Sequence, residues 1–170
     1  MLFCRLVWLL PAAFALHEIE EWNILTWYRQ HYGDLPETTD RTVRMGLFAY
    51  VSIGLLWTVV ALRVRSRREA AFALLPLSLF LLTNAFQHVY WAAHLAAYDP
   101  GLVTAVTLLV PVTGVLIWSA LRQRLVPTWY VAALVLINVP TVVETIRGDG
   151  IVRFEIEAVN SIGAALGGLF

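Results

Sequence analysis

Charge is the property that this sequence has least of. Only 14% of its 170 residues are charged and 59% are apolar, and the mean hydropathy is +0.71. A soluble domain carries about 25% charged residues, and a disordered chain combines low hydrophobicity with high net charge. The composition is therefore typical of neither class, and it indicates an integral membrane protein.

Lysine is absent, and cysteine occurs once, at Cys4. The 12 basic residues are all arginine and are balanced by 12 acidic residues, so no net positive charge is available to bind the phosphates of a nucleic acid. A single cysteine forms no disulfide within the chain and lacks the spacing of a thiolate metal site. We therefore expect neither a nucleic-acid partner nor a cysteine-based metal site.

Long intervals without charge predict membrane-spanning helices. With histidine left uncounted, the charge-free intervals are 45–62, 70–98, 100–121 and 125–143, which contain 18, 29, 22 and 19 residues. A helix needs about 20 apolar residues to cross about 30 Å of hydrocarbon. Each interval is therefore expected to form one span, at approximately 45–62, 70–98, 101–121 and 126–146.

The start of the chain predicts a fifth span that polar residues interrupt. Residues 6–17 are uncharged, His17-Glu18-Ile19-Glu20-Glu21 follows, and the apolar pattern then resumes as far as Tyr28. We interpret 1–28 as one helix with polar groups on one side of its second half. A signal peptide is a competing interpretation, because Ala13-Phe14-Ala15 has the small-x-small form of a cleavage site.

The expected fold is an all-α integral membrane bundle of about five transmembrane helices, forming a single domain over 1–170. The tail 158–170 is apolar but contains three glycines, so we expect at most a short or partial helix there. Arginine in short loops marks the cytoplasmic side. The arginines in question are Arg63, Arg65, Arg67, Arg68, Arg122 and Arg124. They predict a multi-pass protein of the cell membrane with its N-terminus inside and its 29–44 loop outside.

Ionisable side chains inside membrane helices are the candidates for function, because each costs about 2.5–3.5 kcal/mol on insertion scales. His17, Glu20 and Glu21 have the spacing i, i+3, i+4 and share one helix face, whereas Glu18 is rotated about 100° away. Helix 70–98 contains Asn84 and His88 one turn apart, and helix 126–146 contains Glu144.

These polar groups are expected to share one depth. In the predicted topology the first, third and fifth helices run in the same direction, and His17, His88 and Glu144 all lie toward their C-terminal ends. We therefore predict a single site in the outer half of the membrane, at which His17 and His88 converge. Glu20 or Glu21, rather than Glu18, is expected to carry its chemistry.

Imidazole and carboxylate together are typical ligands of zinc, iron or manganese. The pattern predicts a divalent metal, with zinc or iron the leading candidates. Its candidate ligands are His17, Glu20, Glu21, His88 and Glu144. Asn84 is a candidate to orient an imidazole by a hydrogen bond. Both zinc-protease motifs that begin at His17 would need histidine at position 21, where the chain has Glu21. Glu20 or Glu21 is the candidate catalytic base if it is not a ligand.

Each of these residues also has a simpler interpretation. His17, Glu20 and Glu21 can form a buried hydrogen-bonded cluster with Asn84 and His88 that only fixes helix packing. Glu144 can pair with Arg147 at the membrane surface, and His94 can lie at the interface beside the Tyr98 turn. Thr104 is expected to make an ordinary contact between helices.

His17-Glu18-Ile19-Glu20-Glu21 resembles the motif of a bacterial membrane family, the HXXEE proteins. Asn84 and His88 in a long apolar helix, and the segment Tyr98-Asp99-Pro100-Gly101-Leu102-Val103-Thr104, are similar to later parts of that family. The resemblance implies a multi-pass membrane protein of undetermined activity. It gives weight to His17, Glu20 and Glu21, and less to Asn84 and His88.

Three functions are consistent with this sequence. The first is an intramembrane metal-dependent enzyme, a hydrolase or an oxidase, that acts on a lipid-like substrate. The second is a small transporter in which the same side chains relay protons or hold a cation. The third is a structural or regulatory membrane subunit whose polar cluster only sets helix packing.

Overall fold

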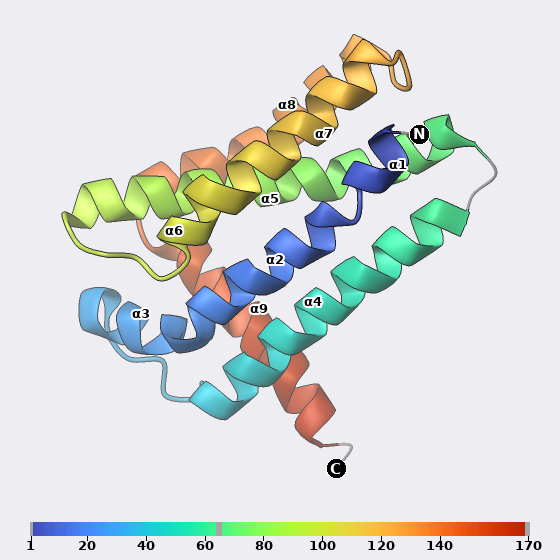
Figure 1. Ribbon diagram of the computed structural model, residues 1–170. Coiled ribbons are helices and arrows are strands. Elements are labelled where there is room, and N and C mark those ends of the chain that lie inside the picture. The colour runs from blue at the N-terminus through green and yellow to red at the C-terminus, as the bar shows by residue number, and fades with distance from the viewer. Residues whose placement is uncertain (1, 64–65, 169–170) are drawn as a thin grey trace.

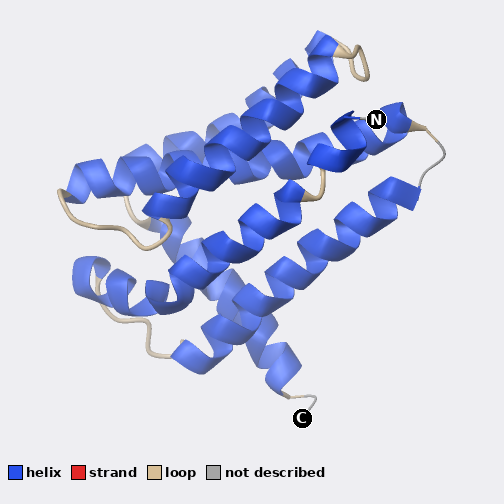
Figure 2. Cartoon of the chain, viewed as in Figure 1, coloured by secondary structure: helices blue, strands red, loops and turns tan. Residues whose placement is uncertain are grey.

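A computed structural model of the chain describes residues 2–63 and 66–168, and Figures 1 and 2 show them as a bundle of helices. The described residues contain no strand, so the predicted all-α fold is confirmed. Met1, Arg65 and residues 169–170, which belong to the predicted first span, the arginine loop and the apolar tail, lie outside the described residues.

Four helices in the described part of the chain are long and apolar enough to cross a membrane. They are α4 (Asp40–Arg63), α5 (Arg67–Leu95), the continuous run Leu102–Arg122, and α8 (Thr128–Arg147). The continuous run comprises α6 (Leu102–Thr104), the π-helical η2 (Ala105–Leu109) and α7 (Val110–Arg122). These helices begin and end close to the charged residues that limit each apolar interval.

The prediction that 1–28 forms one continuous helix is wrong. The segment forms α1 (Leu2–Leu6), α2 (Leu9–Glu20), a 3-10 turn η1 (Glu21–Asn23) and α3 (Ile24–Tyr32). Pro11 accounts for the first break, because its ring lacks an N–H and its bulk crowds the carbonyl of Val7 four residues earlier. That carbonyl accepts a bond from the N–H of Leu10 instead. Ala13 and Phe14, from the possible cleavage site, are buried in α2.

The C-terminal segment is a longer helix than the sequence predicts. It forms α9 (Gly150–Gly167), 18 residues long, which begins eight residues before the expected start at position 158. The charged residues Arg153, Glu155 and Glu157 had excluded this stretch from an apolar helix. They are accommodated because Arg153 pairs with Glu157 on the exposed side, while Glu155 enters the bundle. Figure 1 shows α9 crossing α4.

Helices α2, α5 and α8 run in the same direction, so their C-terminal ends meet at one end of the bundle (Figure 1). A buried apolar cluster that includes Leu10, Leu75, Leu81 and Leu109 joins α2, α5 and η2 beneath this end. A second cluster, which includes Trp27, Trp91 and Ile156, joins α3, α5 and α9. The polar residues of α2 and α5 therefore lie between two packed regions.

Helices α4 and α9 approach each other so closely that only glycine fits at two positions. A Cβ atom added to Gly46 would lie 2.0 Å from the carbonyl oxygen of Val159, and one added to Gly163 would lie 1.8 Å from that of Thr42. Small residues at helix crossings allow this kind of backbone contact in membranes. The crossing fixes α9, and with it Glu155, against the rest of the bundle.

Substituting Gly46 or Gly163 with alanine is expected to destabilise the fold by about 1–3 kcal/mol, because the added methyl group overpacks the α4–α9 crossing. Thermal unfolding in detergent should show a lower Tm for both variants. Gly114→Ala is the matched control, because nothing lies within 4 Å of a Cβ at that position. A Tm for Gly163→Ala equal to that of Gly114→Ala would contradict the close crossing.

The arginine loops predict that the segment between α3 and α4 is exposed outside the cell. In a Cys4→Ser background, a cysteine placed at Glu37 should react with an impermeant maleimide on intact cells. A cysteine placed at Gln123, in the turn after α7, should react only after permeabilisation. The opposite labelling pattern would reverse the orientation of the whole bundle.

Candidate functional site

Two histidines and one glutamate converge at the end of the bundle where α2 and α5 finish. The Nε2 atom of His88 lies 2.8 Å from Oε1 of Glu21, and the Nε2 atom of His17 lies 3.6 Å from the same oxygen. The two imidazole rings are 4.8 Å apart and nearly perpendicular. His17 is 0% exposed and His88 1%. The prediction that these histidines converge on one centre is therefore confirmed.

The far side of the His88 ring is held by Asp99. The Nδ1 atom of His88 donates to Oδ2 of Asp99 at 2.7 Å, and Asp99 itself is 0% exposed. A carboxylate that accepts from one imidazole nitrogen leaves the lone pair on the other nitrogen, which here is the Nε2 atom that faces Glu21. Sequence analysis gives Asp99 no role in the site and names it only as part of the segment 98–104. The signal that could have identified it is its place in the family-like segment 98–104.

The far side of the His17 ring is held by Thr104. The Nδ1 atom of His17 lies 2.9 Å from the hydroxyl of Thr104, and the same hydroxyl donates to Glu20. The expectation that Thr104 makes only an ordinary helix contact is therefore wrong. Both imidazoles are contacted by groups from the segment between α5 and η2. Asn84, which the sequence proposes as an orienting residue, lines the cavity together with Glu21.

Gly101 brings that segment against both rings. Its φ angle is +101°, a conformation that residues with a side chain rarely adopt. A Cβ atom there would lie 2.6 Å from Cε1 of His88 and 2.9 Å from Cε1 of His17. Glycine at this position therefore allows the 96–101 turn to close over the two imidazoles.

Glu20 does not face the shared centre of the two histidines and instead caps the N-terminus of the helix that begins at Leu102. Its carboxylate accepts from the N–H groups of Val103 and Thr104 at 3.1 and 2.7 Å, and from the Tyr98 hydroxyl at 2.6 Å. These contacts are those of a helix cap, which satisfies N–H groups that have no partner within the helix. The hydrogen bond to this carboxylate also raises the pKa of Tyr98 to about 12.

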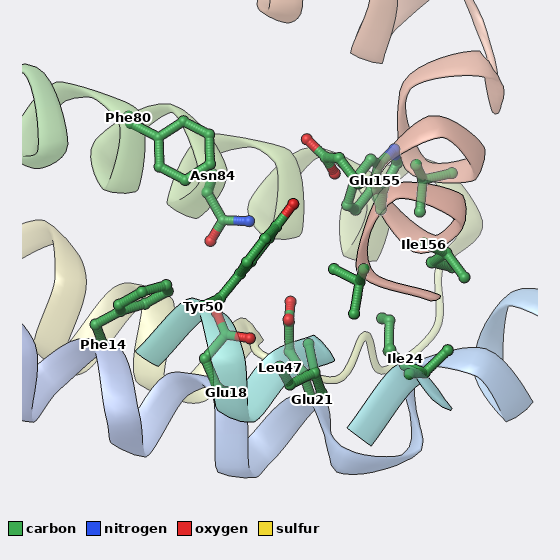
Figure 3. Close-up of a pocket in the computed structure, with 14 residues that line it drawn as sticks. Phe14, Glu18, Glu21, Ile24, Leu47, Tyr50, Phe80, Asn84, Glu155 and Ile156 are labelled. Carbon is green, nitrogen blue, oxygen red and sulfur yellow. The ribbon is translucent and has the colours of Figure 1, made fainter. Parts of the chain in front are cut away.

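Glu18 faces another neighbour rather than headgroups, which are the two surroundings that its rotation of about 100° from His17 allows. It is only 7% exposed and lines a cavity together with Glu21. Residues of α4 and α9 enclose the space that Glu18 faces. Figure 3 shows the Glu18 and Glu21 side chains pointing into this cavity.

The cavity has a volume of about 60 Å³, which is room for a few water molecules. Four polar residues line it, namely Glu18, Glu21, Asn84 and Glu155 (Figure 3). Most of the remaining wall is apolar or aromatic, with Phe14, Tyr50, Phe80 and Trp91 as its aromatic residues. The histidine pair lies behind one side of the cavity, and Glu21 belongs to both.

Glu155 is a member of this site that sequence reasoning missed. It comes from α9, and its Oε1 accepts a hydrogen bond from the side-chain amide of Gln87 at 2.9 Å. Sequence analysis had treated the charges before position 158 as the limit of the apolar tail. The signal that could have identified it is its place in the second turn of an amphipathic helix, where Arg153 and Glu157 can pair with each other.

Glu144 does not join the cluster. It is exposed on α8, and its Oε1 accepts from Arg147 at 2.8 Å. The predicted depth is reasonable, because α8 ends at the same end of the bundle as α5 (Figure 1). The Glu144 side chain points away from the bundle, since no helix packs against this side of α8 in the described structure. His94 is likewise exposed and stacks on Tyr90.

The residues at the centre fit a divalent cation. His17, Glu21 and His88 are buried, and one ligand atom from each lies within 4.8 Å of the others. Each Nε2 atom faces Oε1 of Glu21 without the geometry of a hydrogen bond, so both imidazole lone pairs are available to a cation. Glu18 Oε2 and Asn84 Oδ1 have no hydrogen-bond partner among the described residues. Two imidazoles and one carboxylate form a common catalytic zinc set.

Comparison with known proteins identifies a family. Residues 8–118 match the family described as "Protein of unknown function with HXXEE motif", and the chain belongs to this family. No curated protein and no solved structure matches the chain. The matched region contains His17, Glu21, His88, Asp99 and Thr104, whereas Glu155 lies beyond it.

Replacing Glu20 with alanine is expected to lower stability by about 0.5–2 kcal/mol, because two N–H groups at the start of the 102–122 helix lose their acceptor. The measurement is Tm in detergent against wild type. Glu157→Ala is the control, since the Glu157 carboxylate pairs with Arg153 on the exposed side of α9. Equal Tm values for the two variants would contradict the capping role of Glu20.

Proposed function

We propose that this HXXEE protein is a divalent-metal-dependent enzyme of the cell membrane that acts on a lipid-like substrate. His17, Glu21 and His88 would hold the metal, with zinc and iron as the leading candidates. The observation that carries the proposal is the convergence of both Nε2 atoms on Oε1 of Glu21, while both Nδ1 atoms are engaged elsewhere.

Three protein ligands favour a catalytic centre over a structural one. Structural zinc sites have four protein ligands, whereas catalytic sites have three and keep one position open. Here the open position would face the cavity, because Glu21 lines that cavity. A divalent cation in this position supplies Lewis acidity, which polarises a carbonyl or phosphoryl oxygen and lowers the pKa of water.

The protein residues have separable roles in such a reaction. Asp99 and Thr104 hold the two imidazoles in one orientation, so that their Nε2 lone pairs face the metal position. Glu21 is a ligand and is therefore unsuited to act as the base.

The depth of the cavity supports a substrate from the membrane. Two of the helices that line the cavity, α4 and α5, are long and apolar enough to cross a membrane, and most of the cavity wall is hydrophobic. A polar metabolite would have to leave water to reach it, whereas a lipid would enter from its own solvent. With zinc the chemistry would be hydrolysis of an ester or phosphoester by water, and with iron it would be oxidation of the substrate with dioxygen as the oxidant.

The purified protein is expected to contain about one equivalent of a divalent metal per chain when measured by inductively coupled plasma mass spectrometry. His17→Ala, His88→Ala and Glu21→Gln should each reduce this content at least tenfold, because each removes a ligand. Asp99→Asn should reduce metal affinity by about 10–100-fold, which is typical when the partner of a ligating histidine is changed.

Two matched controls accompany this measurement. His94→Ala removes an exposed histidine from the same helix as His88, and Glu144→Gln removes the exposed carboxylate that the sequence had included among the ligands. Both variants should keep wild-type metal content. A protein that folds, binds no zinc or iron on addition, and keeps its Tm in the presence of chelator would favour the packing interpretation.

A further inference from the structure

The cavity is lined by two carboxyl groups that the proposed metal does not need, Glu18 and Glu155. The charge of a divalent cation at the histidine pair would be balanced by its ligand Glu21 and by Asp99, which contacts the ligand His88. Glu18 and Glu155 are not needed for this balance. Among the described residues that line the cavity, none is arginine, so neither carboxylate has a basic partner there. Unpaired buried carboxylates are costly, and a cationic group on a ligand would offset that cost.

The structure places an unpartnered polar atom where such a ligand would bind. Glu18 is nine-tenths buried, points into the cavity (Figure 3), and its Oε2 has no hydrogen-bond partner within the described residues. Phe14, Tyr50 and Phe80 form part of the wall next to it. Carboxylates combined with aromatic rings are typical of sites that bind organic ammonium groups, which are attracted to both.

An apolar groove continues from the cavity along the bundle. It is lined by residues of α2, α4 and α5, has a volume of about 360 Å³, and shares Phe14, Tyr50 and Phe80 with the cavity. Its other residues include Ile53, Trp57 and Leu77, which lie toward the middle of the bundle. Along α5, Leu77 and His88 are separated by about 16 Å, comparable to an extended chain of about a dozen carbons.

We propose that the substrate of this site is an amphiphile with an ammonium head group and an alkyl chain. The head group binds between Glu18 and Glu155, and the chain lies in the groove against Ile53 and Leu77. This arrangement matches the polarity of the membrane, because the head group lies near one end of the helices and the chain extends toward the bilayer centre. The inference rests on the proposed function for its reaction, although binding itself needs no metal.

A second metal ion is the main competitor for the same carboxylates. Hard divalent cations require several oxygen ligands, and Glu18, Glu155 and Asn84 could supply some of them. The adjoining apolar groove gives no reason for a second metal, whereas an alkyl chain would fill it. The test below therefore compares an amine with an uncharged molecule of the same length, and it measures metal content in parallel.

The test uses the full chain in a neutral maltoside detergent, stripped of metal with EDTA. Binding of tetradecylamine, tetradecanol and butylamine is measured by isothermal titration calorimetry. Tetradecylamine is expected to bind at least tenfold more tightly than tetradecanol, because only the amine meets the carboxylates. Butylamine is expected to bind at least tenfold more weakly than tetradecylamine, because it leaves the groove empty.

Variants test which carboxylates bind the amine. Glu155→Gln and Glu18→Gln should each weaken tetradecylamine binding at least tenfold and leave tetradecanol binding unchanged. Glu157→Gln is the matched control, because it removes an exposed carboxylate from the same helix, and it should bind the amine as wild type does. The comparison of amine with alcohol in wild-type protein needs no variant and stands even if a substitution prevents folding.

The outcomes separate this inference from the proposed function. Equal affinity for tetradecylamine and tetradecanol in wild type would overturn the ammonium site, as would unchanged amine binding in a folded Glu155→Gln protein. Loss of a second equivalent of metal in Glu155→Gln would overturn it in favour of a two-metal centre. Selective amine binding by a protein that takes up no zinc or iron when these are added back would support the binding site and contradict the metal-dependent enzyme.

Discussion

The contact of Glu21 with His17 and His88 is the interaction on which the rest of this structure depends. All three side chains are buried in a membrane-embedded bundle, where each would be costly without polar partners. Glu21 supplies one shared partner, and Asp99 and Thr104 supply the others. The turn that delivers Asp99 and Thr104 passes over the rings at Gly101, so the loop between α5 and η2 is shaped by the same requirement.

The architecture and the central pair of histidines were predictable because both follow from regular patterns. Charge-free intervals near 20 residues correspond to spanning helices, and the i, i+4 spacing of His17 and Glu21 places them on one face. The convergence of His17 and His88 followed from helix direction and depth alone. These rules require only chain length, hydropathy and helical geometry.

The rest of the site depends on which helix packs against which, and a single helix cannot show that. Glu18 was expected to face headgroups or another neighbour, and the cavity that α9 closes on that side could not be foreseen. Glu155 was missed because its helix contains charges that are neutralised or buried only after packing. Glu144 was included because it has the right depth, yet no described helix packs against its face. Glu20 lies on the correct face of α2, but the N–H groups of Val103 and Thr104 engage it.

The close crossing of α4 and α9 at Gly46 and Gly163 has a consequence for the order in which the protein matures. Helix α9 follows every other described helix in the chain, so it is synthesised after α2 and α5, which carry the two histidines. Until α9 docks, the cavity lacks one wall and Glu155 is absent from it. Biosynthesis thus separates formation of the histidine centre from completion of the cavity, and only a chain inserted through α9 has both.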